Sequence, residues 1–320
     1  MPVTNAFETY DAQANREDLS DIIYNIDPFD TPMFTAAGRR NVSNVLFDWQ
    51  TEALPDENLT ASVEGFELDR AAGTATVREN AVAQINHRDA TVSGTQEASD
   101  PAGKRSEMAH QMALVGKALK RDMEKIAFGT IQVEETGSSA TARTTRAFMN
   151  WIFTNTTFQN GAGGADPIPS TNTALVDDSV PVAFTEDMLN DTLQLCYQNG
   201  AEPSLLFCGP GNKRVVSGFV GRASARQNIS AKKVVNSVTV YASDFGDLKV
   251  LPSRWVRTSD VILLDPRYVR IGYFRNFTKS PIAKIGDAET NMILAEWGLQ
   301  VDNEKAHGVI RDTTGEAAAA

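Results

Sequence analysis

The longest regular hydrophobic pattern in the chain lies between Asp100 and Gly129. Apolar side chains recur there at steps of three and four residues, which places them on one face of an α-helix. They are Met108, Met112, Val115, Leu119, Met123 and Ile126. Asp100-Pro101 is a favourable start, because proline at the first helical position loses no hydrogen bond, and Gly129 is a suitable stop. The pattern predicts a helix over residues 100–129, about 40 Å long at about 1.5 Å per residue.

Strict alternation near the carboxyl end predicts a strand with one buried face. The apolar positions are Ile293, Ala295, Trp297, Leu299 and Val301. Glu296, Gln300 and Asp302 lie between or just after them and are expected to face the other way. We expect the apolar stripe of the long helix to cover the buried face, so the chain returns to this helix near its end.

Residues 185–280 show a mixture of short helical and extended patterns. Thr185 is a predicted helix cap, with Phe184 packing on Leu189 and Gly200 ending the helix. A second helix is expected near 212–219. The predicted strands are 204–208, a hairpin of 234–242 with 248–251, then 261–264 and 269–274. This part of the chain predicts a mixed α/β domain.

Two extended segments in the first third of the chain contain few large core side chains. They run from about 44 to 52 and from Gly73 toward Val92, joined by a polar, acidic connection. Two strands of about 12 residues would reach roughly 40 Å, and a lone hairpin of that kind is marginal in water. We expect the hairpin to need a partner surface that the chain does not supply nearby; an ordinary sheet hairpin is the alternative.

Three further segments carry weaker patterns. Residues 1 to about 40 are mostly polar, and Pro28 and Pro32 prevent a long helix, so this part reads as an arm lying on another surface or as a frayed terminus. Residues 136–181 are rich in Ser, Thr, Gly and Asn, with an apolar patch at 148–152 that predicts attachment to the body. Residues 313–320 are a tail.

Composition narrows the classes of function. The 320 residues are 42% hydrophobic and 22% charged, which is typical of a globular chain of roughly two domains. No apolar run of about 18 residues exists, and the start lacks a signal peptide, so we expect no membrane segment. Cys196 and Cys208 are expected to be small core residues in a reducing cytosol. Thirty basic and 41 acidic residues leave a net charge of −11, which argues against a surface that binds the phosphate backbone of nucleic acids.

Candidate catalytic motifs all fail on spacing. His87-Arg88-Asp89 and Asp244-Phe245-Gly246 look like two protein-kinase signatures, but Gly94 stands where the catalytic loop needs an asparagine. Gly209-Pro210-Gly211 lacks the third glycine of a dinucleotide turn and the lysine of a phosphate loop, so it predicts a helix start. No His-x-x-x-His or second cysteine pair supports zinc. We expect no catalytic, cofactor-binding or metal residues, and no enzyme.

Several blocks spread along the chain are similar to those of major capsid proteins of tailed bacteriophages, which have the Hong Kong 97-like fold. The blocks follow the family order and are Tyr10-Asp11, Arg16–Ile26, Asp30-Thr31-Pro32, Trp49-Gln50-Thr51, Val92–Gln96, Leu119–Glu124, Val240-Tyr241, Ser243–Gly246, Leu264-Asp265-Pro266 and Asn303–Gly308. The arm, projecting hairpin, long helix, α/β domain and return strand also match that fold in order. The resemblance gives little guidance for 136–181 and the tail.

The resemblance implies an α+β fold with a defined set of parts. They are an amino-terminal arm (1–39), an extended β-hairpin loop (40–82), a peripheral domain (83–135 and 284–312) around a spine helix (100–129), a Ser/Thr/Gly-rich insertion (136–181), an axial α/β domain (182–283) and a tail (313–320). It also implies that the chain assembles with copies of itself, as hexamers and pentamers, into the icosahedral head of a virion made in the bacterial cytoplasm.

The implied partners follow from the same resemblance. They are a portal protein, a scaffolding protein that is separate because only about 40 residues precede the loop, and, where present, a decoration protein. The shell would enclose double-stranded DNA without sequence-specific binding, which the negative charge suits. Some capsids of this fold form Lys–Asn crosslinks; no lysine lies between Thr35 and Gly103, so we expect non-covalent locking.

Opposite charges on the loop and the spine helix suggest a contact between subunits. The acidic loop residues are Glu52, Asp56, Glu57 and Glu64, and the basic spine residues are Lys104, Arg105 and Lys120. We expect the loop of one copy to meet the spine of its neighbour through these groups. Separately solvated charges are the alternative, because exposed ion pairs contribute little.

Three other functions compete with a phage capsid. An encapsulin-like nanocompartment would have the same fold around a cargo enzyme, but the insertion and the phage-type blocks favour the virus. A cytosolic enzyme with an unrecognised site is disfavoured by the missing motifs. A tail or decoration protein would be smaller and mostly β, which the predicted 100–129 helix contradicts.

Overall fold

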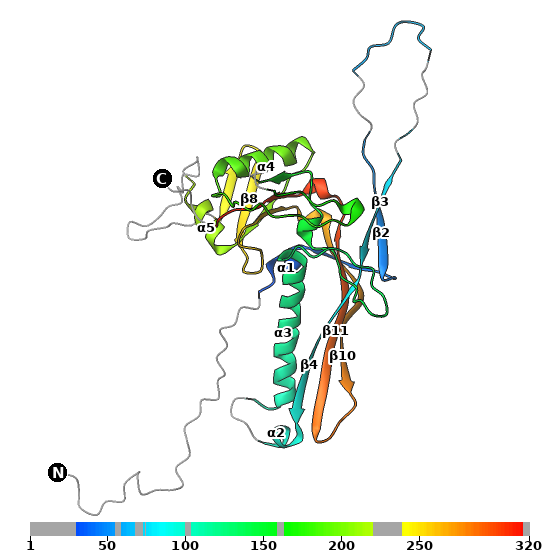
Figure 1. The fold of residues 1–320 in the computed structure, drawn as a ribbon, viewed down its shortest axis with the longest axis vertical. Coiled ribbons are helices and arrows are strands. Elements are labelled where there is room, and N and C mark those ends of the chain that lie inside the picture. The colour runs from blue at the N-terminus through cyan, green and yellow to red at the C-terminus, as the bar shows by residue number, and fades with distance from the viewer. Residues whose placement is uncertain are drawn as a thin grey trace, which may run out of the picture.

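The computed structural model of the chain describes residues 30–54, 59–67, 73, 75–99, 104–158, 163–219 and 239–315. Figure 1 shows a sheet with one long helix running alongside its strands, a second sheet with two helices beside it, and a hairpin that projects from the region where the two sheets meet. The chain is thus an α+β fold, as the sequence predicts. The expected arm up to residue 29 and the tail from 316 lie outside the described residues.

The first sheet has four strands in the order β1-β10-β11-β4. Their bounds are β1 Gly38–Asn41, β4 Gln84–Ser93, β10 Val269–Ile282 and β11 Ala288–Val301. β1 is parallel to β10, while β10, β11 and β4 form antiparallel neighbours, with Trp297 opposite Tyr273 on one side and Gln84 on the other. Helix α3 (Glu107–Phe128) packs along this sheet.

The apolar stripe of α3 covers the sheet as predicted. Leu119 and Met123 pack in one cluster with Trp297 and Leu299 of β11, and Met108 and Met112 pack with Val92 of β4 in a second cluster. The pattern of three- and four-residue steps therefore identified the buried helix face correctly. β11 is the return strand that the alternation predicted.

The start of α3 differs from the prediction. The helix begins at Glu107, seven residues after Asp100, while Asp100–Gly103 lie outside the described residues. Ser106 is the cap, and its Oγ accepts the Ala109 N–H at 3.2 Å. Glu97, from the short helix α2 (Gly94–Ala98), accepts the Met108 N–H at 3.0 Å and the Ser106 hydroxyl at 2.6 Å. These acceptors satisfy the first-turn donors, so the helix starts there and spans about 33 Å.

The second face of β11 is also buried, contrary to the prediction of one buried face. Glu296 and Gln300 are each 1% exposed. Arg275 Nε lies 2.7 Å from Glu296 Oε2, Arg143 pairs with the same carboxylate, and Arg40 Nη1 donates to Gln300 Oε1 at 2.8 Å. The segment 136–181 supplies Arg143 and therefore covers this face, which the sequence pattern could not show.

The second sheet has six strands in the order β5-β12-β9-β6-β8-β7. Their bounds are β5 Thr156–Thr157, β6 Leu205–Cys208, β7 Val240–Ser243, β8 Gly246–Pro252, β9 Val261–Leu264 and β12 Gly308–Ile310. Helices α4 (Glu186–Gln198) and α5 (Pro210–Ser217) pack on it. Thr185 caps α4 as predicted, accepting the Met188 N–H at 3.3 Å. Asn199 is the C-cap, and Gly200 follows at φ +79°.

Strand pairing divides the chain differently from the expected boundaries in three places. β10 was expected in the axial segment 182–283, but it continues to Ile282 and pairs with β11 of the first sheet. β12 was expected with the peripheral segment 284–312, but it pairs with β9 of the second sheet. The segment 136–181 supplies β5, so it is part of the second sheet rather than a separate insertion.

Shorter elements complete the fold. They are helix α1 (Pro32–Ala36), and the 3-10 helices η1 (Phe148–Asn150), η2 (Pro169–Thr171), η3 (Pro266–Tyr268) and η4 (Glu304–Ala306).

Cys196 and Cys208 are both buried and unbridged, as predicted, and burial raises the pKa of each thiol to about 12. Both cysteines are therefore neutral core residues.

Candidate assembly surfaces

The projecting hairpin is fixed to the body at its base. It consists of β2 (Leu46–Thr51) and β3 (Val77–Val82), paired antiparallel with Phe47 opposite Ala81. The paired part is six residues long on each side, shorter than the strands of about 12 residues expected. Phe47 is buried and lies against Gly298 of β11, where an added Cβ would come 3.0 Å from its ring. The hairpin is thus held in a fixed direction by the first sheet.

Beyond this base, the loop carries large apolar side chains in solvent. Leu54 and Leu59 are 92% and 90% exposed, and Val63 and Phe66 are also largely exposed. Figure 1 shows the tip of the loop far from both sheets, whereas Leu54 lies near the base of the hairpin. Several exposed apolar side chains on one projecting element mark an interaction surface. As predicted, the described part of the loop does not bury these apolar side chains against its own chain.

The predicted charged residues occupy two separated places within one chain. Glu52 and Glu64 are exposed on the hairpin side, whereas Asp56 and Glu57 lie outside the described residues. Arg105 is exposed just before α3, at the end remote from the hairpin in Figure 1. Lys104 pairs with Glu107 of its own chain, and Lys120 is exposed with Nζ 5.8 Å from the Phe277 ring centroid. Among the described members of the set, a single chain does not bring the acidic and basic groups together.

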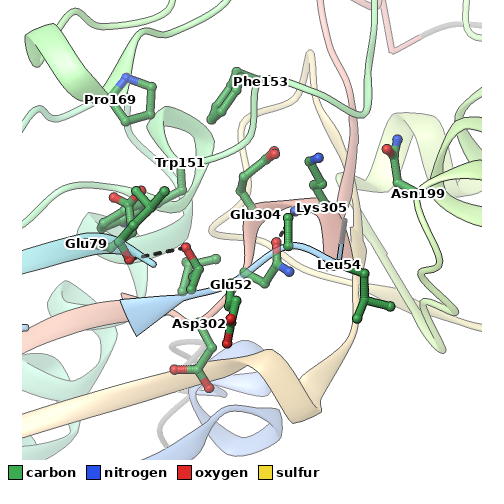
Figure 2. Close-up of a pocket in the computed structure, with 15 residues that line it drawn as sticks. Glu52, Leu54, Glu79, Trp151, Phe153, Pro169, Asn199, Asp302, Glu304 and Lys305 are labelled. Carbon is green, nitrogen blue, oxygen red and sulfur yellow. Dashed lines mark hydrogen bonds between the residues drawn. The ribbon is translucent and has the colours of Figure 1, made fainter. Parts of the chain in front are cut away.

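A pocket of about 480 Å³ lies at the base of the hairpin. It was not predicted from the sequence. Figure 2 shows Glu52 and Leu54 from the hairpin side, Trp151 and Phe153 from the 136–181 segment, and Glu304 from η4 around it. Its lining combines apolar side chains with four carboxylates (Glu52, Glu79, Asp302 and Glu304) and one cation, Lys305. Thr51 and Lys305 are among its lining residues, whereas no histidine, cysteine, serine or tyrosine is.

Burial shifts the acidity of two carboxyls in this pocket. Burial raises the pKa of Glu79, opposed by the nearby Arg146 and assisted by the Glu304 carboxylate. Burial also raises the pKa of Asp302, opposed by its hydrogen bond from Gln300 and by Arg270 and Arg40. A positive group entering the pocket would favour the ionised form of both carboxyls.

The arm is anchored to the spine helix by a buried carboxylate. Glu124 is fully buried, and its two oxygens accept the Met33 N–H at 2.9 Å and the Phe34 N–H at 2.7 Å. Burial raises the pKa of Glu124 to about 7, against the effect of these two hydrogen bonds; the Asp30 carboxylate adds to the rise. The role of Glu124 was not predicted, because a single glutamate within a helical pattern is typical of a solvent-exposed position.

Glu124 predicts a pH dependence of stability. Because its pKa is raised on folding, its contribution is most favourable below about pH 4.5 and is lost as the pH rises to about 7, by roughly 3 kcal/mol in all. Glu124→Gln removes this titration, so its free energy of unfolding should vary less than that of the wild type between pH 5 and 7. Urea unfolding at several pH values tests this, with the exposed Glu135→Gln as the charge-matched control. An equal pH slope in wild type and Glu124→Gln would contradict the assignment.

The rejected catalytic motifs have structural roles. His87 and Asp89 lie on β4, whereas Asp244 and Gly246 lie at the β7–β8 turn in the other sheet. Gly209-Pro210-Gly211 starts α5, as predicted. His307 is buried against Phe148 with ring centroids 5.2 Å apart, and burial lowers its pKa to about 4. Within the described part of the chain, no group of His, Cys, Asp and Glu side chains could hold a metal ion, and no helix is long and apolar enough to cross a membrane.

The fold is found in solved phage capsids. Chains from Microbacterium phage Oxtober96 (TM-score 0.64, 14% identity) and the cyanophage A-1(L) capsid (TM-score 0.63, 13% identity) match 96% and 98% of this chain, and 98% and 100% of their own. The SrpI encapsulin of Synechococcus elongatus also matches, with TM-score 0.58 and 11% identity over 96% of this chain and 95% of its own. The projecting hairpin, spine helix and two sheets thus form the Hong Kong 97-like fold.

Sequence comparison gives the family of the chain. The family model for the SU10 major capsid protein matches residues 3–314, and the chain belongs to that family. The major capsid protein of Escherichia phage Phieco32 is 26% identical over 348 aligned residues, covering 98% of both chains. The chain is therefore a major capsid protein of a tailed phage, a structural component of the capsid, and the encapsulin alternative is less supported.

Proposed function

We propose that copies of this chain form hexamers and pentamers that close into an icosahedral head around double-stranded DNA. The observation that carries this proposal is the projecting loop, whose large apolar side chains are exposed in a single chain. A neighbouring copy supplies the surface that buries them, as in obligate interfaces. The net charge of −11 suits a container that must admit and release DNA without gripping its phosphates.

The parts of the chain have separate roles in this proposal. Residues 1–39 form the arm, and 40–82 form the loop that reaches over an adjacent subunit. The peripheral domain is the four-stranded sheet with α3, which includes β10 as well as β4 and β11. The axial domain is the six-stranded sheet with α4 and α5, which gathers at fivefold and sixfold centres and includes β5 and β12. No residue has a catalytic role.

The proposed partners are those that the family resemblance implies. Besides its own copies, the chain meets a portal protein at one vertex, a separate scaffolding protein during assembly and, where present, a decoration protein outside. One solved structure that shares the fold, from Phage G, is described as containing major capsid and decoration proteins. Synthesis takes place in the bacterial cytoplasm, and the finished chain resides in the virion.

The acidic loop of one copy pairs with the basic spine of its neighbour in this proposal. Glu52 and Glu64 are exposed, and so are Arg105 and Lys120, so all four are accessible to another chain. Lys104 is engaged by Glu107 within its own chain, which makes it the weakest member of the predicted set. The contact would bring together the hairpin of one copy and the start of α3 of the next, which lie at opposite ends of a single molecule in Figure 1.

Charge reversal tests this pairing. Glu52→Lys with Asp56→Lys should weaken assembly and reduce its dependence on salt, since exposed pairs are screened at high ionic strength. Adding Lys120→Glu should restore part of the loss. Glu135→Lys with Glu202→Lys, two exposed carboxylates away from the loop, is the matched control. Unchanged assembly and unchanged salt dependence in the loop variant would refute the pairing.

Electron microscopy of the purified, overexpressed chain tests the shell itself. We expect closed particles, or rings of five and six subunits where scaffolding protein is needed for closure. A chain that stays monomeric at high concentration with the scaffolding protein present would overturn the proposal.

A further inference from the structure

Residues 163–182, which we call the strap, are attached to the body next to the end of β12. The Val182 N–H donates to the Asp312 carbonyl oxygen at 2.8 Å, two residues after that strand. Leu175 of the strap is buried. Three other large apolar side chains of the strap are about half exposed, and they are Ile168, Val176 and Val180. Because the strap buries little apolar surface, its polar contacts decide how firmly it stays in place.

Two arginines of the body reach the strap. Arg311, which directly follows β12, is 1% exposed. Its Nη1 donates to the Ala165 carbonyl oxygen at 2.8 Å, and its Nη2 lies 3.1 Å from the Asp166 carboxylate. Arg257, from the connection between β8 and β9, donates to the Asp177 carboxylate. Both strap carboxylates are therefore paired with cations of the second sheet.

The carboxylates at this place outnumber the arginines. Asp260 and Asp312 are 0% and 3% exposed, and both face Arg257 and Arg311. We use the name latch cluster for these two aspartates, the two arginines, and Asp166 and Asp177 of the strap. With all four carboxyls ionised, the latch cluster has an excess of two negative charges. Such an excess is costly where water is excluded.

Two buried carboxyl oxygens of the latch cluster lack donors. Within the described part of the chain, neither Asp260 Oδ2 nor Asp312 Oδ2 has a hydrogen-bond partner. Asp260 Oδ2 lies 3.4 Å from Arg257 Nε, and the Asp312 carboxylate accepts the Asp178 N–H with its other charge site. A buried, ionised oxygen without a donor costs free energy, whereas protonation converts it to a neutral hydroxyl that donates. This arrangement favours a bound proton.

Burial makes the latch cluster titrate close to neutral pH. It raises the pKa of Asp260 to about 6, against the effects of Arg257 and the Ser259 hydroxyl. The Asp177 and Asp312 carboxylates add to this rise, and burial also raises the pKa of Asp312. A carboxyl with a raised pKa stabilises the closed form most below about pH 4, and this contribution is lost as the pH rises to about 6.

We propose that the latch cluster is a proton-dependent latch, which holds the strap closed while it carries a proton and loosens the strap when all its carboxyls are ionised. Loosening reaches the base of the hairpin, because Pro169 of the strap lines the pocket there. The Pro169 carbonyl oxygen also accepts the Arg146 guanidinium at 3.2 Å. The latch acts within one chain and does not rest on the proposed shell.

Hydrogen exchange measured by mass spectrometry tests the latch in the full chain. The signal is the exchange of peptides that cover 163–182, corrected for the intrinsic pH dependence of amide exchange. Between pH 4.5 and 7 the opening constant of the strap should rise about tenfold or more, and it should change little from pH 7 to 8. Peptides from α4 are the internal reference and should change less. An opening constant that stays level or falls between pH 4.5 and 7 would overturn the proposal.

Two variants assign the effect to the latch cluster. Asp260→Asn removes the titrating carboxyl but keeps the shape of the side chain, so the strap should open as rarely at pH 7 as at pH 4.5. Asp312→Asn should reduce the pH dependence as well, and asparagine tolerates the φ of +59° at this position. Asp191→Asn, exposed on α4, is the matched control and should keep the wild-type pH dependence.

The wild-type measurement needs no variant, so it remains decisive where a substitution impairs folding. A rise in the opening constant that persists undiminished in both Asp260→Asn and Asp312→Asn would show that other groups control the strap, and the latch would then be rejected.

Discussion

A chain with the substitutions Leu54→Ser, Leu59→Ser, Val63→Ser and Phe66→Ser is expected to fold normally and fail to assemble. All four side chains are exposed in the single chain, so their loss should change the free energy of unfolding by no more than about 0.5 kcal/mol. If a neighbour buries them, each contributes about 1.5–3 kcal/mol to the contact. The summed loss of at least about 6 kcal/mol raises the concentration needed for assembly by more than about a thousandfold.

Sedimentation and electron microscopy measure this effect alongside thermal unfolding. The matched control is Leu54→Met, Leu59→Met, Val63→Ile and Phe66→Leu, which keeps apolar side chains at the same four positions. We expect this control to assemble. If the serine variant assembles as well as the control, the loop is not the surface that joins the subunits.

The main elements of the fold were predictable because they follow from local periodicity. Apolar steps of three and four residues identified the buried face of α3, and alternation identified β11. The start of α3 was not predictable, because its cap depends on Glu97 from another helix as well as on Ser106. Asp100-Pro101 is an equally good start by local rules alone.

Contacts between distant residues account for the remaining differences. Glu296 alternates with apolar residues and so reads as solvent-facing, but Arg143 and Arg275 neutralise it within the fold. A hydrophobic pattern predicts a strand but not the strand that pairs with it. The pairing of β10 with β11 and of β12 with β9 could therefore not be predicted. These features needed the structure.

The assembly surfaces were predictable in part. The scarcity of core side chains indicated a projecting hairpin, and Glu52 and Glu64 are exposed on its side of the molecule. The pocket beneath the hairpin and the Glu124 anchor were missed. Each combines residues far apart in the chain, such as Glu52 with Glu304 and Glu124 with Met33.

One residue connects the arm anchor, the spine helix and the hairpin base. Trp297 is fully buried in the core cluster that includes Leu119 and Met123 of α3. Its ring packs edge-on against Phe34, with centroids 5.3 Å apart, and its Nε1 donates to Asn86 Oδ1 at 2.9 Å. The next residue, Gly298, is in close contact with Phe47 of the hairpin. Loss of the Trp297 side chain should therefore affect both folding and assembly.

Trp297→Ala is expected to lower the free energy of unfolding by about 3–5 kcal/mol, because it removes a large buried side chain and leaves a cavity. Urea unfolding measures this loss, and Trp297→Phe, which retains most of the packing but not the hydrogen bond to Asn86, should show a smaller one. Since domains are stable by only about 5–15 kcal/mol, the alanine variant should also yield little assembled product. A decrease in the free energy of unfolding below about 1 kcal/mol would show that other residues hold the arm anchor, the spine helix and the hairpin base together. Because the loop variant should lose assembly without losing stability, the two experiments separate the surface that joins subunits from the core that orients it.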